Sequence, residues 1–104
     1  MRAVALYTLL CLTIACSASL KAPSNTEVAY AKQRFPEVDS LQLTHGYKLY
    51  VRKCSSCHSL YYPGQFTYTE WVEVFPEMAE DAKLDSAESK LISTYVFALA
   101  KQDF

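Results

Sequence analysis

The chain has 104 residues, which is enough for one domain at most. Hydrophobic residues make up 51% of it, with only 2 Gly and 4 Pro, which argues against intrinsic disorder and low-complexity linkers. The 10 basic and 11 acidic side chains nearly cancel, whereas a nucleic-acid binder needs an excess of Lys and Arg. We therefore expect a small globular domain with no nucleic-acid partner.

The first 15 residues have the pattern of a secretory signal peptide. Arg2 gives a positive start, and the 13 residues from Ala3 to Ala15 carry no charge. This run is too short to span a bilayer, which needs about 20 residues. We expect residues 1–15 to be removed on export, and Cys11 to leave with them.

Cys16 directly follows this segment, where residues 12–16 read LTIAC. The pattern resembles a bacterial lipoprotein signal, in which this cysteine becomes the lipid-bearing first residue, although Thr13 stands where leucine is usual. Cleavage near Ala18 and retention as an uncleaved anchor are the alternatives. We expect residues 16–26 to tether a domain of residues 27–104 to the periplasmic side of a bacterial membrane.

Local signals predict helices through most of the remaining chain. Residues 28–34 form a short helix that ends at Phe35, because the residue before Pro36 is pushed out of helical conformation. A capping box at residues 39–42 opens a second helix that runs into Cys54. Its apolar positions recur at helical spacing and are Leu43, Tyr47, Tyr50 and Val51.

Two further capping boxes predict two more helices. The box at residues 67–70 precedes an apolar face, within which Pro76 predicts a kink or a division into two short helices. The box at residues 85–88 opens the last helix. The apolar faces are Trp71, Val74, Phe75, Met78 and Ala82 in the first, and Leu91, Ile92, Tyr95, Val96 and Leu99 in the second. No segment alternates apolar and polar residues, so we predict an all-α fold with three main helices and a possible fourth.

The strongest chemical signal is the segment Cys54-Ser55-Ser56-Cys57-His58. Two thiols three positions apart at a helix end can bond to the two vinyl groups of one haem, and the adjacent histidine places its imidazole under the iron. We therefore predict one covalent haem c at Cys54 and Cys57, with His58 as the proximal iron ligand. The export signal strengthens this prediction, because haem is attached covalently outside the cytoplasm.

Three other interpretations use the same residues. A thioredoxin-like redox pair would need alternating strands and helices around the motif, and this pattern is absent from the sequence. A zinc site could recruit Cys54, Cys57, His58 and His45, but a spacing of nine residues between His45 and Cys54 on one helix is unlike a usual zinc module. A disulfide between Cys54 and Cys57 is the third alternative.

From about Asp39 to Phe104, the sequence resembles the small single-haem cytochromes c. In that family, a glycine lies eight residues and an aromatic residue four residues before the first haem cysteine, and here these are Gly46 and Tyr50. The family packs this helix across the last one, with Tyr95 as the expected contact of Gly46, because glycine lets two helix backbones approach closely. The resemblance implies a cytochrome c-like fold of three main helices around one covalently bound haem.

The resemblance also implies that Met78 is the distal iron ligand. Met78 lies 20 residues after His58 and seven after Trp71, and small bacterial cytochromes share the second spacing. The alternative is that Met78 only fills a gap in the core, as flexible thioether side chains often do. His45 is a rival ligand, but nine residues of helix place it more than about 10 Å from Cys54 along the axis, so we expect it to be a partly exposed helix residue.

Charge is unevenly divided along the chain. Six basic and three acidic residues lie between Lys21 and Lys53, whereas seven acidic residues and only Lys83 lie between Glu70 and Glu88. Two solvated helix faces would explain this division. The functional alternative is a dipolar surface that orients docking on a redox partner protein.

Together these patterns predict a lipid-anchored, monohaem c-type cytochrome, an electron carrier and not an enzyme, that moves single electrons outside the cytoplasmic membrane. Its expected partners are redox proteins and, through the lipid anchor, the membrane. Histidine–methionine ligation would raise the reduction potential relative to two histidines. The alternatives are a haem site that binds a small ligand or peroxide, if Met78 does not coordinate iron, and a redox module without haem.

Overall fold

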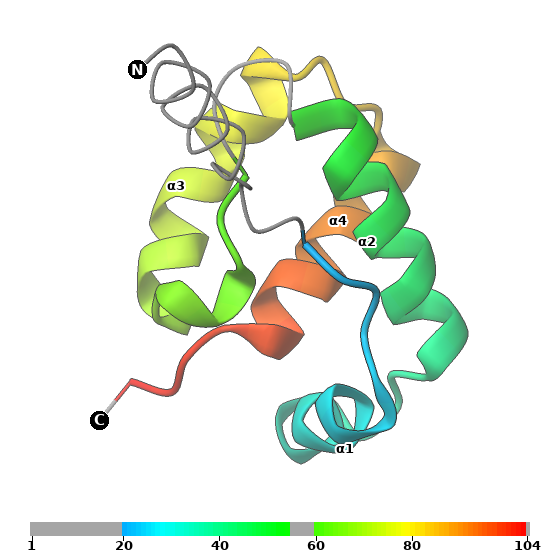
Figure 1. Cartoon of the computed structure of the whole chain (residues 1–104). Coiled ribbons are helices and arrows are strands. Elements are labelled where there is room, and N and C mark those ends of the chain that lie inside the picture. Colours follow the sequence, from blue (N-terminus) through cyan, green and yellow to red (C-terminus); the bar gives the residue numbers. More distant parts are fainter. Residues whose placement is uncertain (1–19, 55–59, 104) are drawn as a thin grey trace, which may run out of the picture.

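The computed structural model describes residues 20–54 and 60–103 (Figure 1). The elements in this part are α1 (Asn25–Arg34), α2 (Ser40–Cys54), the 3₁₀-helix η3 (Pro63–Gln65), α3 (Tyr68–Asp81) and α4 (Ser86–Leu99). The described part contains no strand, only an isolated bridge between Thr67 and Lys101. The all-α prediction is therefore confirmed for these residues, which contain four α-helices where three main ones and a possible fourth were expected.

Reciprocal capping sets the start of α2. The Gln42 backbone N–H donates to Asp39 Oδ1 at 2.7 Å, and the Asp39 N–H donates to Gln42 Oε1 at 3.1 Å. The boxes at residues 67–70 and 85–88 have the same reciprocal bonds and open α3 and α4. All three predicted helix starts are confirmed.

Ordered contacts begin before the expected domain start at residue 27. Helix α1 begins at Asn25, and the Leu20 carbonyl already accepts a hydrogen bond from Tyr47 Oη at 2.8 Å. The helix ends at Arg34, as the proline that follows predicts. Long-range bonds then fix α1, because Tyr30 Oη donates to the Ala100 carbonyl at 2.7 Å and Arg34 Nη1 to the Phe97 carbonyl at 2.8 Å.

Pro76 lies inside α3 without dividing it. The helix is continuous from Tyr68 to Asp81, so the prediction of two short helices is wrong. Proline has no N–H to donate to the Val72 carbonyl four residues earlier. Both residues are exposed, so water can satisfy that carbonyl.

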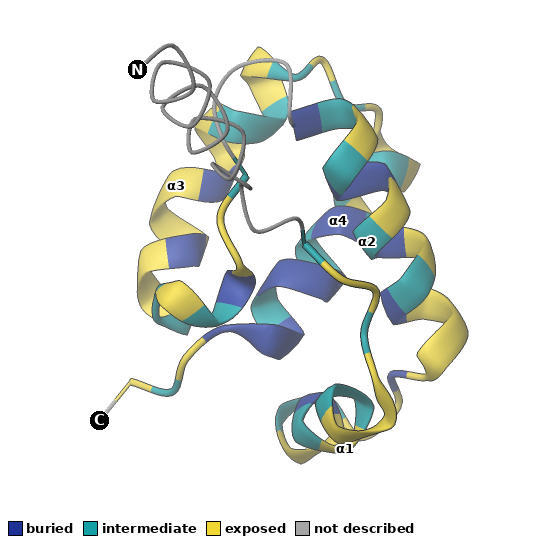
Figure 2. Cartoon of the chain, in the orientation of Figure 1, coloured by how far each residue is buried: buried dark blue, intermediate teal, exposed yellow. Residues whose placement is uncertain are grey.

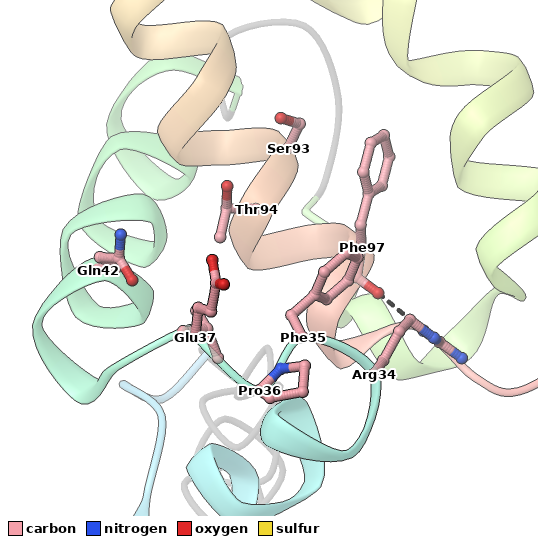
Figure 3. Close-up of a pocket in the computed structure, with 9 residues that line it drawn as sticks. Arg34, Phe35, Pro36, Glu37, Gln42, Ser93, Thr94 and Phe97 are labelled. Carbon is pink, nitrogen blue, oxygen red and sulfur yellow. Dashed lines mark hydrogen bonds between the residues drawn. The ribbon is translucent and has the colours of Figure 1, made fainter.

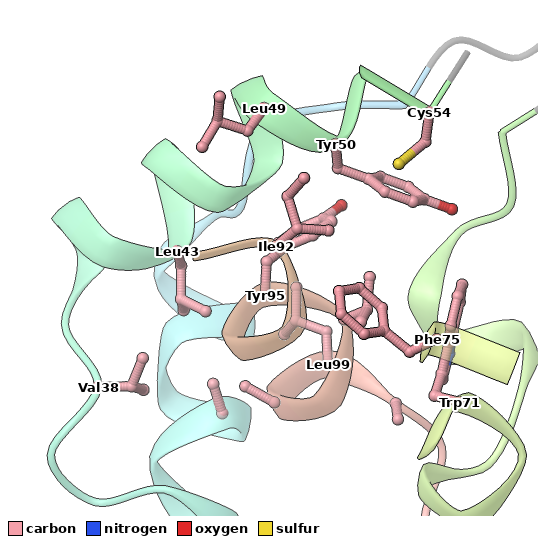
Figure 4. Packing of buried hydrophobic residues seen from close by; sticks show 14 residues of the cluster. Val38, Leu43, Leu49, Tyr50, Cys54, Trp71, Phe75, Ile92, Tyr95 and Leu99 are labelled. Carbon is pink, nitrogen blue, oxygen red and sulfur yellow. The ribbon is translucent and has the colours of Figure 1, made fainter. Parts of the chain in front are cut away.

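Helix α4 is the centre of the fold. Helices α2 and α3 flank it on opposite sides, and it buries Ile92, Tyr95, Val96, Ala98 and Leu99 (Figures 1 and 2). Gly46 of α2 lies against Tyr95, which confirms the contact expected between these helices. The core then extends to Trp71 and Phe75 of α3 (Figure 4). Among the described residues, none of the helices combines the length and the apolar content that crossing a bilayer requires.

Candidate functional site

Cys54 is the last residue of α2 and lies at the edge of the core. Its side chain is buried and lies beside Tyr50, one helical turn earlier (Figure 4). Cys57 and His58 lie in residues 55–59, and Cys16 lies in residues 1–19. All three are outside the described residues. The structure therefore places the first cysteine of the predicted attachment motif, while haem attachment, proximal ligation and lipidation stay predictions.

Tyr50 connects the end of α2 to the segment that follows the motif. It is fully buried, and its Oη donates to the Tyr61 carbonyl at 2.9 Å. Burial raises the pKa of Tyr50 to about 12 despite this hydrogen bond. The phenol therefore stays protonated near neutral pH and holds Tyr61 beside the end of α2.

Tyr61 forms one wall of a groove that runs along α3. The groove has a volume of about 360 Å³ and is lined by Tyr61, Phe66, Glu70, Trp71, Glu73, Val74 and Met78. Trp71, Val74 and Met78 are three and four residues apart, so they share one face of the helix. Met78, the predicted distal ligand, is thus half-buried in this groove. Tyr61 of the same lining is hydrogen-bonded to Tyr50, one helical turn before Cys54.

Val74 belongs to the predicted apolar face of α3, but the core does not cover it. Its side chain is 47% exposed and lines the groove. Tyr61, which also lines the groove, is 43% exposed. Uncovered apolar walls around a concave site are typical of a binding site for an apolar group.

Trp71 gives the groove a rigid wall. It is buried, and its Nε1–H donates to the Pro63 carbonyl at 2.7 Å. Its ring contacts Phe66 edge to face with centroids 5.7 Å apart, and Tyr50 at 6.4 Å. Sequence reasoning missed the bond to Pro63, because the Pro63-Gly64 pair indicates only a loop.

His45 lies away from the groove, as expected. It is exposed on α2, whereas Cys54 is buried at the end of the same helix. Within residues 20–54 and 60–103, no three His, Cys, Asp or Glu side chains gather into a group that could hold a metal ion. The alternative zinc site also needs Cys57 and His58, which lie outside the described residues.

The groove lies on the acidic side of the molecule. Glu70 and Glu73 line it, and α3 carries five acidic residues and no basic one. Hydrogen bonds from Thr67 hold the pKa of Glu70 below its usual range, so its carboxylate is ionised at neutral pH. Helix α2 has no acidic residue and lies on the other side of α4 (Figure 1). The uneven charge along the sequence therefore becomes a separation of charge in space.

A second hollow lies between the turn after α1 and α4 (Figure 3). It also has a volume of about 360 Å³, and its lining includes Glu37, Gln42, Thr94 and Phe97. None of the predicted haem-binding residues is among those that line it. Arg34 is the cationic residue of this lining. Its side chain already donates a hydrogen bond to the Phe97 carbonyl, and its guanidinium carbon lies 5.1 Å from the centre of the Tyr68 ring.

The groove along α3 has the chemistry that a haem requires. Its apolar walls would cover the flat ring, and the thioether of Met78 is a known axial ligand of haem iron. The buried Cys54 lies one turn from Tyr50, whose hydrogen bond holds Tyr61, a residue of the groove lining. The described residues therefore fit a haem that is attached at the end of α2 and lies against α3.

Comparison with known protein families gives a match. The family model described as dihaem cytochrome c matches residues 50–103, just over half of the chain. The matched region includes the complete Cys-x-x-Cys-His segment and Met78. No curated protein and no solved structure matches.

Proposed function

Because the chain belongs to the dihaem cytochrome c family, and is therefore a c-type cytochrome, we propose that it carries single electrons outside the cytoplasmic membrane. Membership of this family favours an electron carrier over an enzyme. The observation that carries the proposal is the groove along α3, which both Met78 and Tyr61 line. Tyr61 accepts a hydrogen bond from Tyr50, which lies one helical turn before Cys54.

We propose one covalent haem for each chain. The family description names two haems, but covalent attachment needs a pair of cysteines followed by histidine. The sequence contains one such segment, at residues 54–58, and its other two cysteines are Cys11 and Cys16. A count of one therefore follows from the attachment chemistry of this chain.

Each residue of the proposed site has a separate task. Cys54 and Cys57 would form the thioether bonds, and His58 and Met78 would be the proximal and distal iron ligands. The haem supplies a one-electron change at its iron. The buried Trp71, fixed by its hydrogen bond to the Pro63 carbonyl, keeps the groove wall rigid and excludes water from the ring.

The proposed location is the periplasmic side of a bacterial membrane. Residues 1–15 would direct export, and Cys16 would carry the lipid that anchors the domain. The proposed partners are redox proteins that meet the acidic side of the molecule, where Glu70 and Glu73 border the groove.

A haem site that binds small ligands is the second candidate. It is favoured by the half-buried position of Met78 in a groove that opens to solvent between exposed apolar walls. If Met78 does not coordinate iron, carbon monoxide should bind the reduced protein readily. If Met78 does coordinate iron, it should compete with that ligand.

A reductive titration of the exported protein tests the proposal. We expect a c-type absorption spectrum and the uptake of one electron per chain in a single reversible step. Uptake of two electrons would contradict the single haem, and a chain without visible haem absorption would contradict the electron-carrier function.

A further inference from the structure

The outer face of α2 carries a strip of exposed residues that the haem site does not use. Leu41, His45, Lys48 and Arg52 are four, three and four residues apart, so they share one side of the helix. All four are exposed, and Leu41 is 77% exposed although it is a large apolar residue. We call these four residues the α2 strip.

The charge of this face is cationic. Helix α2 has no acidic residue, and Lys48 and Arg52 project from its outer side. Glu88 of α4 is the acidic neighbour: it forms an ion pair with Lys53 at 3.2 Å and is attracted by Arg52. Asp39 caps the N-terminal end of the helix, so the excess of positive charge lies in its C-terminal half.

The path of the chain towards Cys16 leads to this same helix. The Leu20 carbonyl accepts a hydrogen bond from Tyr47 Oη of α2 at 2.8 Å, and Lys21 next to it is exposed. Cys16 precedes Leu20 by four residues, which can span at most about 14 Å when fully extended. A lipid on Cys16 would therefore keep α2 close to the membrane surface.

We propose that the α2 strip, together with Lys21, lies on an anionic lipid surface. Lys and Arg side chains near such a surface are attracted to its headgroups, and an exposed leucine can enter the interface beside them. The acidic helix α3 lies on the other side of α4 and is repelled by the same surface (Figure 1). The membrane thus orients the groove along α3 outwards, towards soluble partners.

This inference rests on the proposed anchoring, but the strip can be tested separately from the lipid. The test uses the haem-loaded mature chain, residues 16–104, with Cys16→Ser, which cannot be acylated, and measures co-sedimentation with vesicles. One set of vesicles is pure phosphatidylcholine and the other contains one quarter phosphatidylglycerol. Acylation of the wild-type chain is measured independently by mass, so a failure of anchoring and a failure of the strip give different results.

We expect the partition coefficient to rise with phosphatidylglycerol and to fall at high salt. In the same Cys16→Ser background, Lys48→Glu with Arg52→Glu should reduce binding to the anionic vesicles by about tenfold or more. The matched control is Lys83→Glu with Lys101→Glu, which changes the net charge equally at exposed positions outside α2 and should retain most of the binding.

Three results would overturn the proposal. Equal binding to both kinds of vesicle would show that the lipid charge is not recognised. Unchanged binding of the Lys48 and Arg52 variant would show that the strip is not the contact. An equal loss in the Lys83 and Lys101 control would show that net charge alone is responsible. Absorption spectra and far-UV circular dichroism that match the parent would show that the variants are folded.

Discussion

Gly46 on α2 and Tyr95 on α4 are in such close contact that a Cβ atom added to Gly46 would lie 2.7 Å from Tyr95 Cβ. The same added atom would overlap the backbone carbonyl of Leu91, which cannot move without shifting α4. Glycine costs helix stability at this position, so its presence is explained by the close approach of the two helices.

Gly46→Ala should therefore destabilise the protein. Overpacking costs about 1–3 kcal/mol, and the higher helix propensity of alanine returns only about 1 kcal/mol. Chemical denaturation of the haem-loaded protein measures the change in unfolding free energy. His45→Ala, at an exposed position of the same helix, is the matched control and should stay within about 0.5 kcal/mol of wild type. Equal stability of the two variants would contradict the close packing.

Met78→Ala should lower the reduction potential and open the iron to carbon monoxide. We expect a shift on the order of 0.1 V, a fraction of the range over which axial ligands set haem potentials. Val74→Ala removes apolar volume from the same groove and should preserve both the potential and the closed site. If Met78→Ala changes neither the potential nor the carbon monoxide binding of the wild-type protein, Met78 is only a packing residue.

Stability should fall between about pH 10 and 12, partly through Tyr50. Its pKa is about 12 in the folded protein and 10.0 for the free side chain, so above pH 10 the unfolded chain ionises first. The stabilisation that protonated Tyr50 gives the folded state is present in full below pH 10 and is lost as pH rises towards 12. Burial raises the pKa of Tyr95 as well, which adds to the effect.

Tyr50→Phe isolates this contribution. It should cost about 1 kcal/mol at neutral pH, since the Tyr61 carbonyl loses its hydrogen bond. Unfolding free energies measured from pH 8 to 12 should then depend less steeply on pH than those of wild type. The same slope in both proteins would mean that Tyr50 does not titrate in this way.

The acidic border of the groove should steer charged redox reagents. We expect Glu73→Lys to slow oxidation by the cation hexaammineruthenium(III) by about threefold at low ionic strength, and to speed oxidation by the anion ferricyanide. Stopped-flow absorbance measures both rates. Glu37→Lys is the control, because it makes the same charge change at an exposed position outside the groove lining. Identical rates for Glu73→Lys and Glu37→Lys would argue against steering at the groove.

Local chemistry explains why much of the fold could be predicted. Capping boxes at Asp39, Thr67 and Asp85 fix three helix starts through bonds between residues three positions apart, and such bonds can be read from sequence. Gly46 and Tyr95 could be paired only through the family resemblance, since they lie 49 positions apart in the sequence. Cys54 lies at the end of α2, as the helix pattern predicts.

What could not be predicted depends on contacts distant in sequence. The bonds of Tyr30 and Arg34 to the end of α4 join residues more than 60 positions apart and have no local signal. Val74 lies three residues after Trp71 on the apolar face of α3, yet it is exposed because it lines the groove. A helical pattern identifies an apolar face but does not tell whether protein or a bound group covers it.

The intact mass of the mature, exported protein tests the central claim most directly. We predict a chain that retains the mass of one haem after denaturation and acid–acetone extraction, and that loses it when Cys54 and Cys57 are both replaced by alanine. Proteolytic mapping should place that mass on the peptide containing residues 54–58. A polypeptide mass without haem, or a mass with two haems, would contradict the account.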